Sequence, residues 1–141
     1  EIQLDLAGFA RKPVSLHSRR CLRQTLECAV AFKHRTGLNA HMHWFTESKK
    51  LVRICNDEGI YVSVGPTILA SEQAQAVAQE IETDLLLFET DAPVVVGGVS
   101  GHPQRVRVVA EHLAMLLGVS WHELAEQTTE NFFRFIGKEP A

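Results

Sequence analysis

Apolar residues along this chain follow two patterns, one typical of helices and one typical of short strands. In residues 19–36, leucine, alanine and phenylalanine recur at helical spacing, and Gly37 follows as a helix stop. Residues 60–65 alternate instead and are rich in β-branched side chains, which favours a strand. Together the two patterns predict strands at residues 13–17, 38–44, 60–65 and 85–88, and helices at residues 19–36, 47–58, 71–81, 104–117 and 121–136.

Residues that favour caps and turns mark the boundaries of these elements. Ser71 and Ser120 suit the N-cap positions of the helices that follow them. Glu123, three residues after Ser120, completes the pattern of a capping box. Residues 96–103 are rich in glycine and are expected to form a loop, and residues 1–12 are expected to be the tail of an earlier helix.

The predicted order is a helix followed by four repeats of strand and helix. Such alternation indicates a parallel sheet whose strands are joined by right-handed crossovers. Four strand–helix units can form a small doubly wound sheet. They are also half of a (β/α)8 barrel, which typically needs about 250 residues. The pattern therefore predicts an α/β chain and leaves these two architectures open.

The last predicted strand runs directly into two carboxylates, because residues 85–93 read LLLFETDAP. A run that is apolar at every position is typical of a strand covered on both faces, as in a parallel sheet. Ligands and catalytic groups of such sheets lie at the C-terminal ends of the strands, which makes Asp91 a candidate functional residue. The alternative is that Asp91 caps the turn beside Pro93.

Two other predicted strands end in histidines, the first at His17 and the second at His43. Two imidazoles and the Asp91 carboxylate at the mouths of separate parallel strands form a typical metal-binding set, suited to zinc, manganese or a similar divalent ion. Such an ion supplies hydroxide near neutral pH or polarises a phosphoryl or carbonyl oxygen. Each histidine taken alone also fits a hydrogen-bonded core residue. His41 shares the face of His43 one layer deeper and is a minor candidate ligand.

Composition limits the classes of protein to which the chain can belong. Its 141 residues suffice for one domain with a core, and 45% hydrophobic and 22% charged residues are ordinary for a globular protein. A net charge of -3 does not favour a polybasic nucleic-acid binder, although it allows a local basic pocket. No apolar run approaches the length of a membrane helix, so no membrane partner is expected.

The cysteines and the first residue bear on location and completeness. Cys21, Cys28 and Cys55 are an odd set without CxxC spacing, which favours a reduced, cytoplasmic protein. No signal peptide is visible. Because the chain begins with Glu1 and not with methionine, we expect that its native start was trimmed or lies upstream.

Five segments of the chain occur in the order of a known family. They read PVSLHSR, HWFTES, YVSVGP, ETDAP and TTENFFRFIG. In this order they resemble the TatD-type metal-dependent hydrolases, which are deoxyribonucleases with a (β/α)8 TIM barrel. The resemblance implies that residues 1–141 form a single partial hydrolase domain, equivalent to the C-terminal half of that barrel.

The resemblance also implies a role for individual residues. His17 and His43 fall on positions that bind one metal, and Asp91 falls on the position that helps to hold the other next to the attacking water. The intact family site holds two divalent ions, with zinc, magnesium and manganese as the candidates. Arg19 matches an arginine expected near a substrate phosphate, where a guanidinium suits bidentate contact. Asn131 falls in the closing helix, where we expect a packing and capping role.

The chain departs from the family pattern in three places. The family's opening HxH strand and its bridging glutamate lie in the N-terminal half of the barrel, and this chain has neither. Glu47 replaces the usual glycine of the His-x-Phe-Thr-Gly-Ser stretch, which adds negative charge near a phosphate site. The loop after ETDAP lacks the Arg-Asn-Glu-Pro run of many bacterial members.

Three functions therefore stay open. The first is metal-dependent hydrolysis of phosphodiester bonds, with DNA as the substrate and Asp91 as the catalytic group that orients the water or accepts its proton. The second is an inactive barrel fragment that associates with itself or with a missing N-terminal half, because an open half-barrel exposes sheet edges. The third is a related hydrolase that acts on ester or amide bonds.

Overall fold

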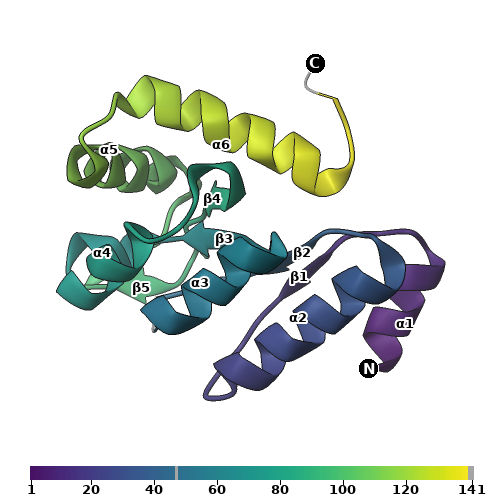
Figure 1. Ribbon diagram of the computed structural model, residues 1–141. Helices are drawn as coiled ribbons and strands as arrows, with labels where there is room; N and C mark the ends of the chain where they lie inside the picture. The colour runs from purple at the N-terminus through teal and green to yellow at the C-terminus, as the bar shows by residue number, and fades with distance from the viewer. Residues whose placement is uncertain (47, 140–141) are drawn as a thin grey trace.

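Four short parallel strands form the centre of the protein in the order β1-β2-β3-β4. The computed structural model describes residues 1–46 and 48–139 (Figure 1). The strands are β1 Val14–Leu16, β2 Ala40–Met42, β3 Tyr61–Val64 and β4 Leu86–Phe88. Each strand pairs in parallel with the next strand along the chain, as the alternating sequence pattern predicts.

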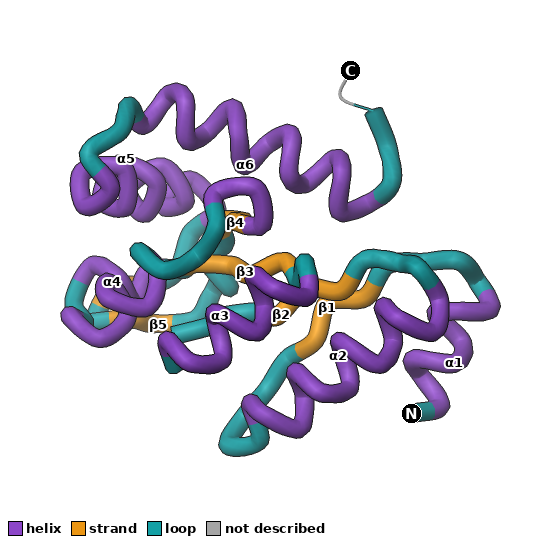
Figure 2. Tube along the Cα trace, in the orientation of Figure 1, coloured by secondary structure: helices purple, strands orange, loops and turns teal. Residues whose placement is uncertain are grey.

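Helices connect the strands and cover both faces of the sheet (Figure 2). The α-helices are α1 Ile2–Phe9, α2 Leu22–Thr36, α3 Lys49–Glu58, α4 Glu72–Ala78, α5 Val106–Leu117 and α6 Trp121–Ile136, and the short 3-10 helices are η1 Pro66–Leu69, η2 Thr83–Leu85 and η3 Pro103–Arg105. In both ribbon and tube views, α2 and α3 lie below the strands and α6 lies above them. None of the helices in the described part of the chain is long and apolar enough to cross a membrane.

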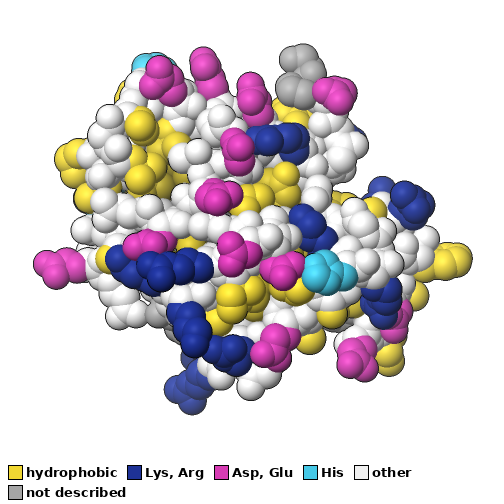
Figure 3. All heavy atoms as spheres, in the orientation of Figure 1, with side chains coloured by type: hydrophobic (Ala, Val, Ile, Leu, Met, Phe, Trp, Pro, Cys, Tyr) yellow, Lys and Arg dark blue, Asp and Glu magenta, His cyan; other side chains and the backbone are white. Residues whose placement is uncertain are grey.

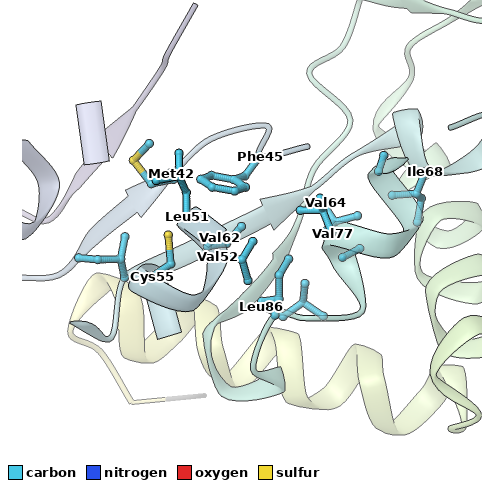
Figure 4. Packing of buried hydrophobic residues seen from close by; sticks show 14 of the residues in the cluster. Met42, Phe45, Leu51, Val52, Cys55, Val62, Val64, Ile68, Val77 and Leu86 are labelled. Atoms are coloured by element: carbon cyan, nitrogen blue, oxygen red, sulfur yellow. The ribbon is translucent and has the colours of Figure 1, made fainter. Parts of the chain in front are cut away.

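One face of the sheet is apolar and forms the core with the helices that connect the strands. Figure 4 shows Met42, Val62 and Leu86 gathered with Val52 and Cys55 of α3, and all five side chains are buried. Burying one such aliphatic side chain stabilises the fold by roughly 1.5–3 kcal/mol. The strand residues on this face are apolar because the helices exclude water from it.

The opposite face of the sheet is polar, although it is largely covered. Pairing places Ser15 beside His41 and His41 beside Tyr61, and Ser63 lies further along β3. Phe135 of α6 packs edge-on against the rings of His41 and Tyr61, with centroid separations of 5.7 and 5.4 Å. The polar face carries the row of side chains that continues, at the strand ends, into His17, His43 and Glu89.

The predicted helix boundaries are correct to within a few residues, with one instructive shift. The helix expected from residue 19 begins at Leu22, because Arg20 has a left-handed φ of 63° and Cys21 is the N-cap. Ser71 acts as an N-cap, as expected, and accepts a hydrogen bond from the backbone N–H of Ala74.

Ser120 is likewise an N-cap, but it does not form the expected capping box. Its hydroxyl accepts from the N–H of His122 at 3.3 Å, one residue before the Glu123 that the capping-box pattern requires.

The glycine-rich segment 96–103 was expected to be a loop, and this prediction is wrong. Strands β5 Val95–Val96 and β6 Val99–Ser100 form an antiparallel hairpin. Gly97 and Gly98, with φ of 58° and 76°, form its two-residue turn, because positive φ at both central positions matches the twist of a tight hairpin. The valines on either side of a Gly-Gly pair are the signal for this hairpin.

The sheet ends in two strands that each pair on one side only, β1 and β4, within the described residues. Beside β1, helix α1 exposes Ile2, Leu6 and Phe9, which retain 77%, 61% and 91% of their accessible surface. These three side chains form an exposed apolar surface on α1.

Candidate metal centre

His43 and Glu89 meet at the C-terminal ends of β2 and β4. The backbone N–H of His43 donates to the carbonyl of Leu16 at 3.0 Å, and that of Glu89 donates to Val64 at 3.1 Å. These bonds extend the ladder past the strand ends and fix the direction of both side chains. His43 Nδ1 donates to Glu89 Oε2 at 2.5 Å, and the side chains are only 19% and 14% exposed.

This hydrogen bond sets the tautomer of His43 and leaves its second nitrogen facing Asp91. A carboxylate only accepts, so Nδ1 carries the proton and Nε2 presents a lone pair. Nε2 lies 3.6 Å from Asp91 Oδ2, which is beyond hydrogen-bond distance. Two electron-pair donors thus face each other across a gap.

A divalent cation fits this gap. Zinc binds imidazole nitrogen and carboxylate oxygen at about 2.0–2.2 Å, which places two such ligands of a tetrahedral ion about 3.4 Å apart. The observed separation of 3.6 Å between His43 Nε2 and Asp91 Oδ2 matches that value closely. The buried Glu89 Oε1 has no partner among the described residues, which is consistent with a site whose polar surroundings extend beyond this chain.

His17 completes the set of three residues that the sequence predicts as ligands. It follows β1, is exposed, and its ring centroid lies 5.5 Å from that of His43. His17, His43 and Asp91 therefore gather at one end of the sheet. Residues 1–46 and 48–139 contain no cluster of three or more His, Cys, Asp or Glu side chains that could hold an ion by itself. The donors fit a divalent metal in type, and they form only part of a ligand set.

Three loops at this end of the sheet contain a non-glycine residue with left-handed backbone geometry. Arg20 follows β1 with φ 63°, Trp44 follows β2 with φ 52°, and Asp91 follows β4 with φ 47°. Such conformations cost roughly 1–3 kcal/mol each and persist only where surrounding contacts fix them. They cluster in the loops that carry His17, His43 and Asp91.

Contacts that hold two of these loops are evident. The N–H of Trp44 donates to the hydroxyl of Ser63 at 3.1 Å, and the Trp44 ring lies 6.1 Å from the His43 ring. Both Trp44 and Glu89 lie against Gly65, where an added Cβ would contact each of them at 3.5–3.6 Å. Trp44 therefore forms a wall of the site next to the Glu89 side chain.

The turn that contains Asp91 leaves its carboxylate available. The backbone carbonyl of Asp91 accepts from the N–H of Val94 at 2.9 Å, and the Ala92–Pro93 peptide bond is cis. Within the described residues, the Asp91 side chain makes no hydrogen bond to this turn. The turn therefore positions Asp91 through its backbone, and the side chain faces His43.

His41 lies one layer below His43 and differs from it in its surroundings. It is buried, and its Nδ1 lies 2.9 Å from the hydroxyl of Ser15. Burial, together with the nearby His43, lowers the pKa of His41 to about 4, so its imidazole is neutral at physiological pH. Its Nε2 has no partner among the described residues.

Arg19 and Asn131 lie at different ends of the structure. Arg19 is exposed two residues after His17, and it forms no ion pair within the described residues. Asn131 of α6 is fully buried and donates to the carbonyls of Thr83 at 2.6 Å and Leu86 at 2.8 Å. These bonds join α6 to the start of β4, which agrees with the packing role expected for Asn131.

Sequence reasoning placed Glu89 at the strand end but gave it no role. The available signal was its spacing, because residues two apart at the end of a strand share a face, as Glu89 and Asp91 do. The contact with His43 joins strands that are not neighbours in the sheet, so no local pattern shows it. Glu47, which replaces the family's usual glycine, lies outside the described residues.

The known proteins whose sequences match this chain are metal-dependent hydrolases and deoxyribonucleases. The sequence model of the family described as TatD related DNase matches residues 1–137. A metal-dependent hydrolase of Escherichia coli K12 named YcfH is 38% identical over 139 residues, which cover 94% of this chain and 52% of YcfH. The human deoxyribonuclease TATDN3 is 26% identical over 138 residues, which cover 96% of this chain and 49% of that protein.

Solved structures show the same relation at the level of the fold. The crystal structure of YJJV, a TatD homologue of Escherichia coli, superposes with a TM-score of 0.84 at 25% identity, over 96% of this chain and 54% of YJJV. A TatD-family hydrolase of Entamoeba histolytica superposes with a TM-score of 0.82. The chain thus spans about half the length of the relatives it matches. The prediction of half a (β/α)8 barrel is confirmed over the alternative of a small doubly wound sheet.

Proposed function

Because this chain belongs to the TatD related DNase family, we propose that it forms the metal-binding C-terminal half of a hydrolase that cleaves phosphodiester bonds in DNA. The observation that carries the proposal is the placement of His43 between Glu89 and Asp91. A histidine fixed on one side by a carboxylate, with its other nitrogen directed at a second carboxylate, is typical of hydrolytic metal centres.

We assign the metal-binding role to His17, His43 and Asp91. A zinc, magnesium or manganese ion held there would lower the pKa of a bound water and offset negative charge on the phosphate. The chain's own contribution is to hold the donors at the mouths of β1, β2 and β4. Glu89 keeps the Nε2 lone pair of His43 directed towards Asp91.

Asp91 is the proposed catalytic residue. Its side chain is 41% exposed, whereas that of Glu89 is 14% exposed, so Asp91 is the carboxylate that water and substrate reach. It orients the attacking water or accepts its proton. We assign contact with a phosphate oxygen of the substrate to Arg19, which is exposed and two residues from His17.

The remaining ligands come from outside this chain in our proposal. Residues 1–141 form one partial domain, and a segment that carries an HxH strand and a glutamate completes both the barrel and the metal site. The one-sided pairing of β1 and β4 and the exposed apolar face of α1 support this association. A second copy of the chain is the alternative partner. The three free cysteines support a reducing, cytoplasmic location.

Metal content of the purified 141-residue protein tests the assignment. The control is a variant in which His17, His43 and Asp91 are all replaced by alanine. We expect less than one zinc or manganese ion per chain in the parent protein, because its ligand set is incomplete, and none in the variant. The same amount of bound metal in the two proteins would remove these three residues as ligands, and no metal in either would mean that the ligands from outside this chain are required.

Hydrolysis assays separate the substrate classes. A labelled oligonucleotide, with and without added metal, tests the phosphodiesterase, and p-nitrophenyl acetate tests the ester hydrolase that stays open as an alternative. We expect the protein to cleave the oligonucleotide when metal is present and not to cleave p-nitrophenyl acetate. Cleavage of the ester alone would refute the nuclease proposal, and no cleavage of either substrate would favour an inactive fragment.

A further inference from the structure

Basic side chains concentrate in two short segments that follow the candidate ligands. The chain has 14 lysine and arginine residues. Six of them lie within residues 19–23 and 49–53, at the starts of α2 and α3, and we name these six the basic ridge: Arg19, Arg20, Arg23, Lys49, Lys50 and Arg53. Figure 3 shows dark-blue side chains gathered over this part of the surface, at the lower left. The ridge is a strong local concentration in a chain whose net charge is -3.

Part of the ridge is neutralised within the protein and part of it is not. Lys49 and Arg53 form ion pairs with Glu80 at 3.1 and 3.4 Å. Within residues 1–46 and 48–139, no carboxylate lies within 4 Å of the charged groups of the other four, which are Arg19, Arg20, Arg23 and Lys50. All four are exposed. Unpaired like charges gathered in one region create a positive potential that attracts anions.

The ridge begins at the candidate metal centre and leads away from it. Arg20 is three residues after His17, so its Cα lies at most about 10 Å from that of His17. Further along, Arg23 and Leu51 line the same shallow groove between α2 and α3. Lys50 precedes Leu51 in the first turn of α3. The cations form a path from the metal centre across two neighbouring helices.

We propose that the basic ridge binds the phosphates of a nucleic-acid strand on one side of the scissile bond. This inference rests on the proposed function, since the scissile phosphate lies at the metal centre. Each nucleotide of a strand carries one phosphate charge, so a strand that follows the ridge meets several phosphates. Arginine suits this contact because its guanidinium binds two phosphate oxygens at once. Glu27, on the rim of the same groove, limits how far the strand follows α2.

Binding to the intact 141-residue chain tests the ridge without requiring turnover. The probe is a fluorescein-labelled 20-nucleotide DNA strand, and its anisotropy gives Kd at 50 to 300 mM salt. The test variant carries Arg20→Gln and Arg23→Gln. The matched control carries Arg11→Gln and Lys12→Gln, an equal change of charge at exposed residues that precede β1, at the opposite end of the sheet. Circular dichroism and Tm show that each variant is folded.

Losing two phosphate contacts lowers the slope of log K against log salt by about 1.4 for a single strand. At 100 mM salt it raises Kd by about tenfold or more. We expect both effects in the Arg20/Arg23 variant and less than a twofold change in the control. An equal change of Kd in the two variants would mean that DNA affinity depends only on the net charge of the chain. This result would refute phosphate binding by the basic ridge. Absence of DNA binding by the parent chain at 50 mM salt would overturn it as well.

The binding experiment can refute the basic ridge without refuting the proposed hydrolase activity, and the reverse is also possible. If the parent chain binds DNA through the ridge but no metal-loaded form of the protein cleaves it, the ridge stands and the proposed function fails. If the protein cleaves DNA while the Arg20/Arg23 variant binds it as tightly as the parent, the proposed function stands and the ridge is refuted.

Discussion

Replacing Glu89 by glutamine tests whether the Glu89–His43 contact prepares the metal site. Glutamine keeps the size of the side chain and can still accept from His43 Nδ1, but it removes the charge. The hydrogen bond of 2.5 Å joins two side chains that are 14% and 19% exposed, so solvent screens it weakly. A hydrogen bond to a charged group contributes roughly 1.5–3 kcal/mol, against about 1 kcal/mol for a neutral one.

The expected loss follows from this difference. Weakening the bond lowers the basicity of Nε2 and frees the imidazole ring to rotate away from Asp91. Residues that orient a metal-binding histidine typically contribute a factor of 10–100 to metal affinity. We therefore expect about tenfold weaker metal binding in Glu89→Gln and up to about a hundredfold in Glu89→Ala, where the acceptor is lost.

Competition with a chromogenic zinc chelator measures this affinity directly. Glu126→Gln, an exposed substitution on α6, is the matched control, because it removes the same charge from a residue that forms no ion pair with His43. The Glu89→Gln variant should also keep the Tm of the parent protein within a few degrees. Zinc affinity within twofold of the parent, in a folded Glu89→Gln variant, would refute the role assigned to the contact.

Four further predictions concern the site, the core and the thiols. Asp91→Asn should abolish metal-dependent hydrolysis in the complete protein and leave it folded, and unchanged turnover would exclude Asp91 from catalysis. His17→Ala should reduce metal content, and metal equal to that of the parent would count against a ligand role. Leu86→Ala should lower the free energy of unfolding by about 2–5 kcal/mol in urea titrations, because Leu86 is 1% exposed in the core, and a loss below about 1 kcal/mol would contradict its placement. Alkylation with iodoacetamide between pH 6 and 9 should modify the exposed Cys21, because hydrogen bonds from Thr25 and Ser18 lower the pKa of its thiol. Cys55 should stay unmodified in the folded protein, because burial raises the pKa of its thiol to about 12. Mass spectrometry that finds Cys55 modified first would show that α3 is misplaced.

The sequence was sufficient for the strand–helix alternation because each strand is apolar on the face that packs against helices. Predicted strands 13–17 and 60–65 contain the observed β1 and β3, and the errors are at their ends. The error in residues 96–103 has a specific cause. Glycine was read there as a sign of irregular structure, although a Gly-Gly pair between valines favours a tight hairpin.

The candidate site was predictable in its residues but not in its contacts. His17, His43 and Asp91 are each recognisable as polar residues that end a strand, and the parallel sheet brings them to one end. The bond between His43 and Glu89 depends on β2 and β4 lying on either side of β3, and on the rotamers of both side chains. Such a contact is a property of tertiary packing, which single-sequence patterns do not contain.

The left-handed residues Arg20, Trp44 and Asp91 have a consequence for protein engineering. A search for thermostabilising substitutions that scores backbone geometry would select glycine or asparagine at these three positions, since each relieves roughly 1 kcal/mol or more of strain. The same substitutions would remove the proposed catalytic carboxylate of Asp91, the wall of the site that Trp44 forms, and the Arg20 cation of the basic ridge. The substitutions that relieve most backbone strain therefore lie where they would be most damaging to activity. A stabilised variant of this protein is better sought on the exposed surface of α6.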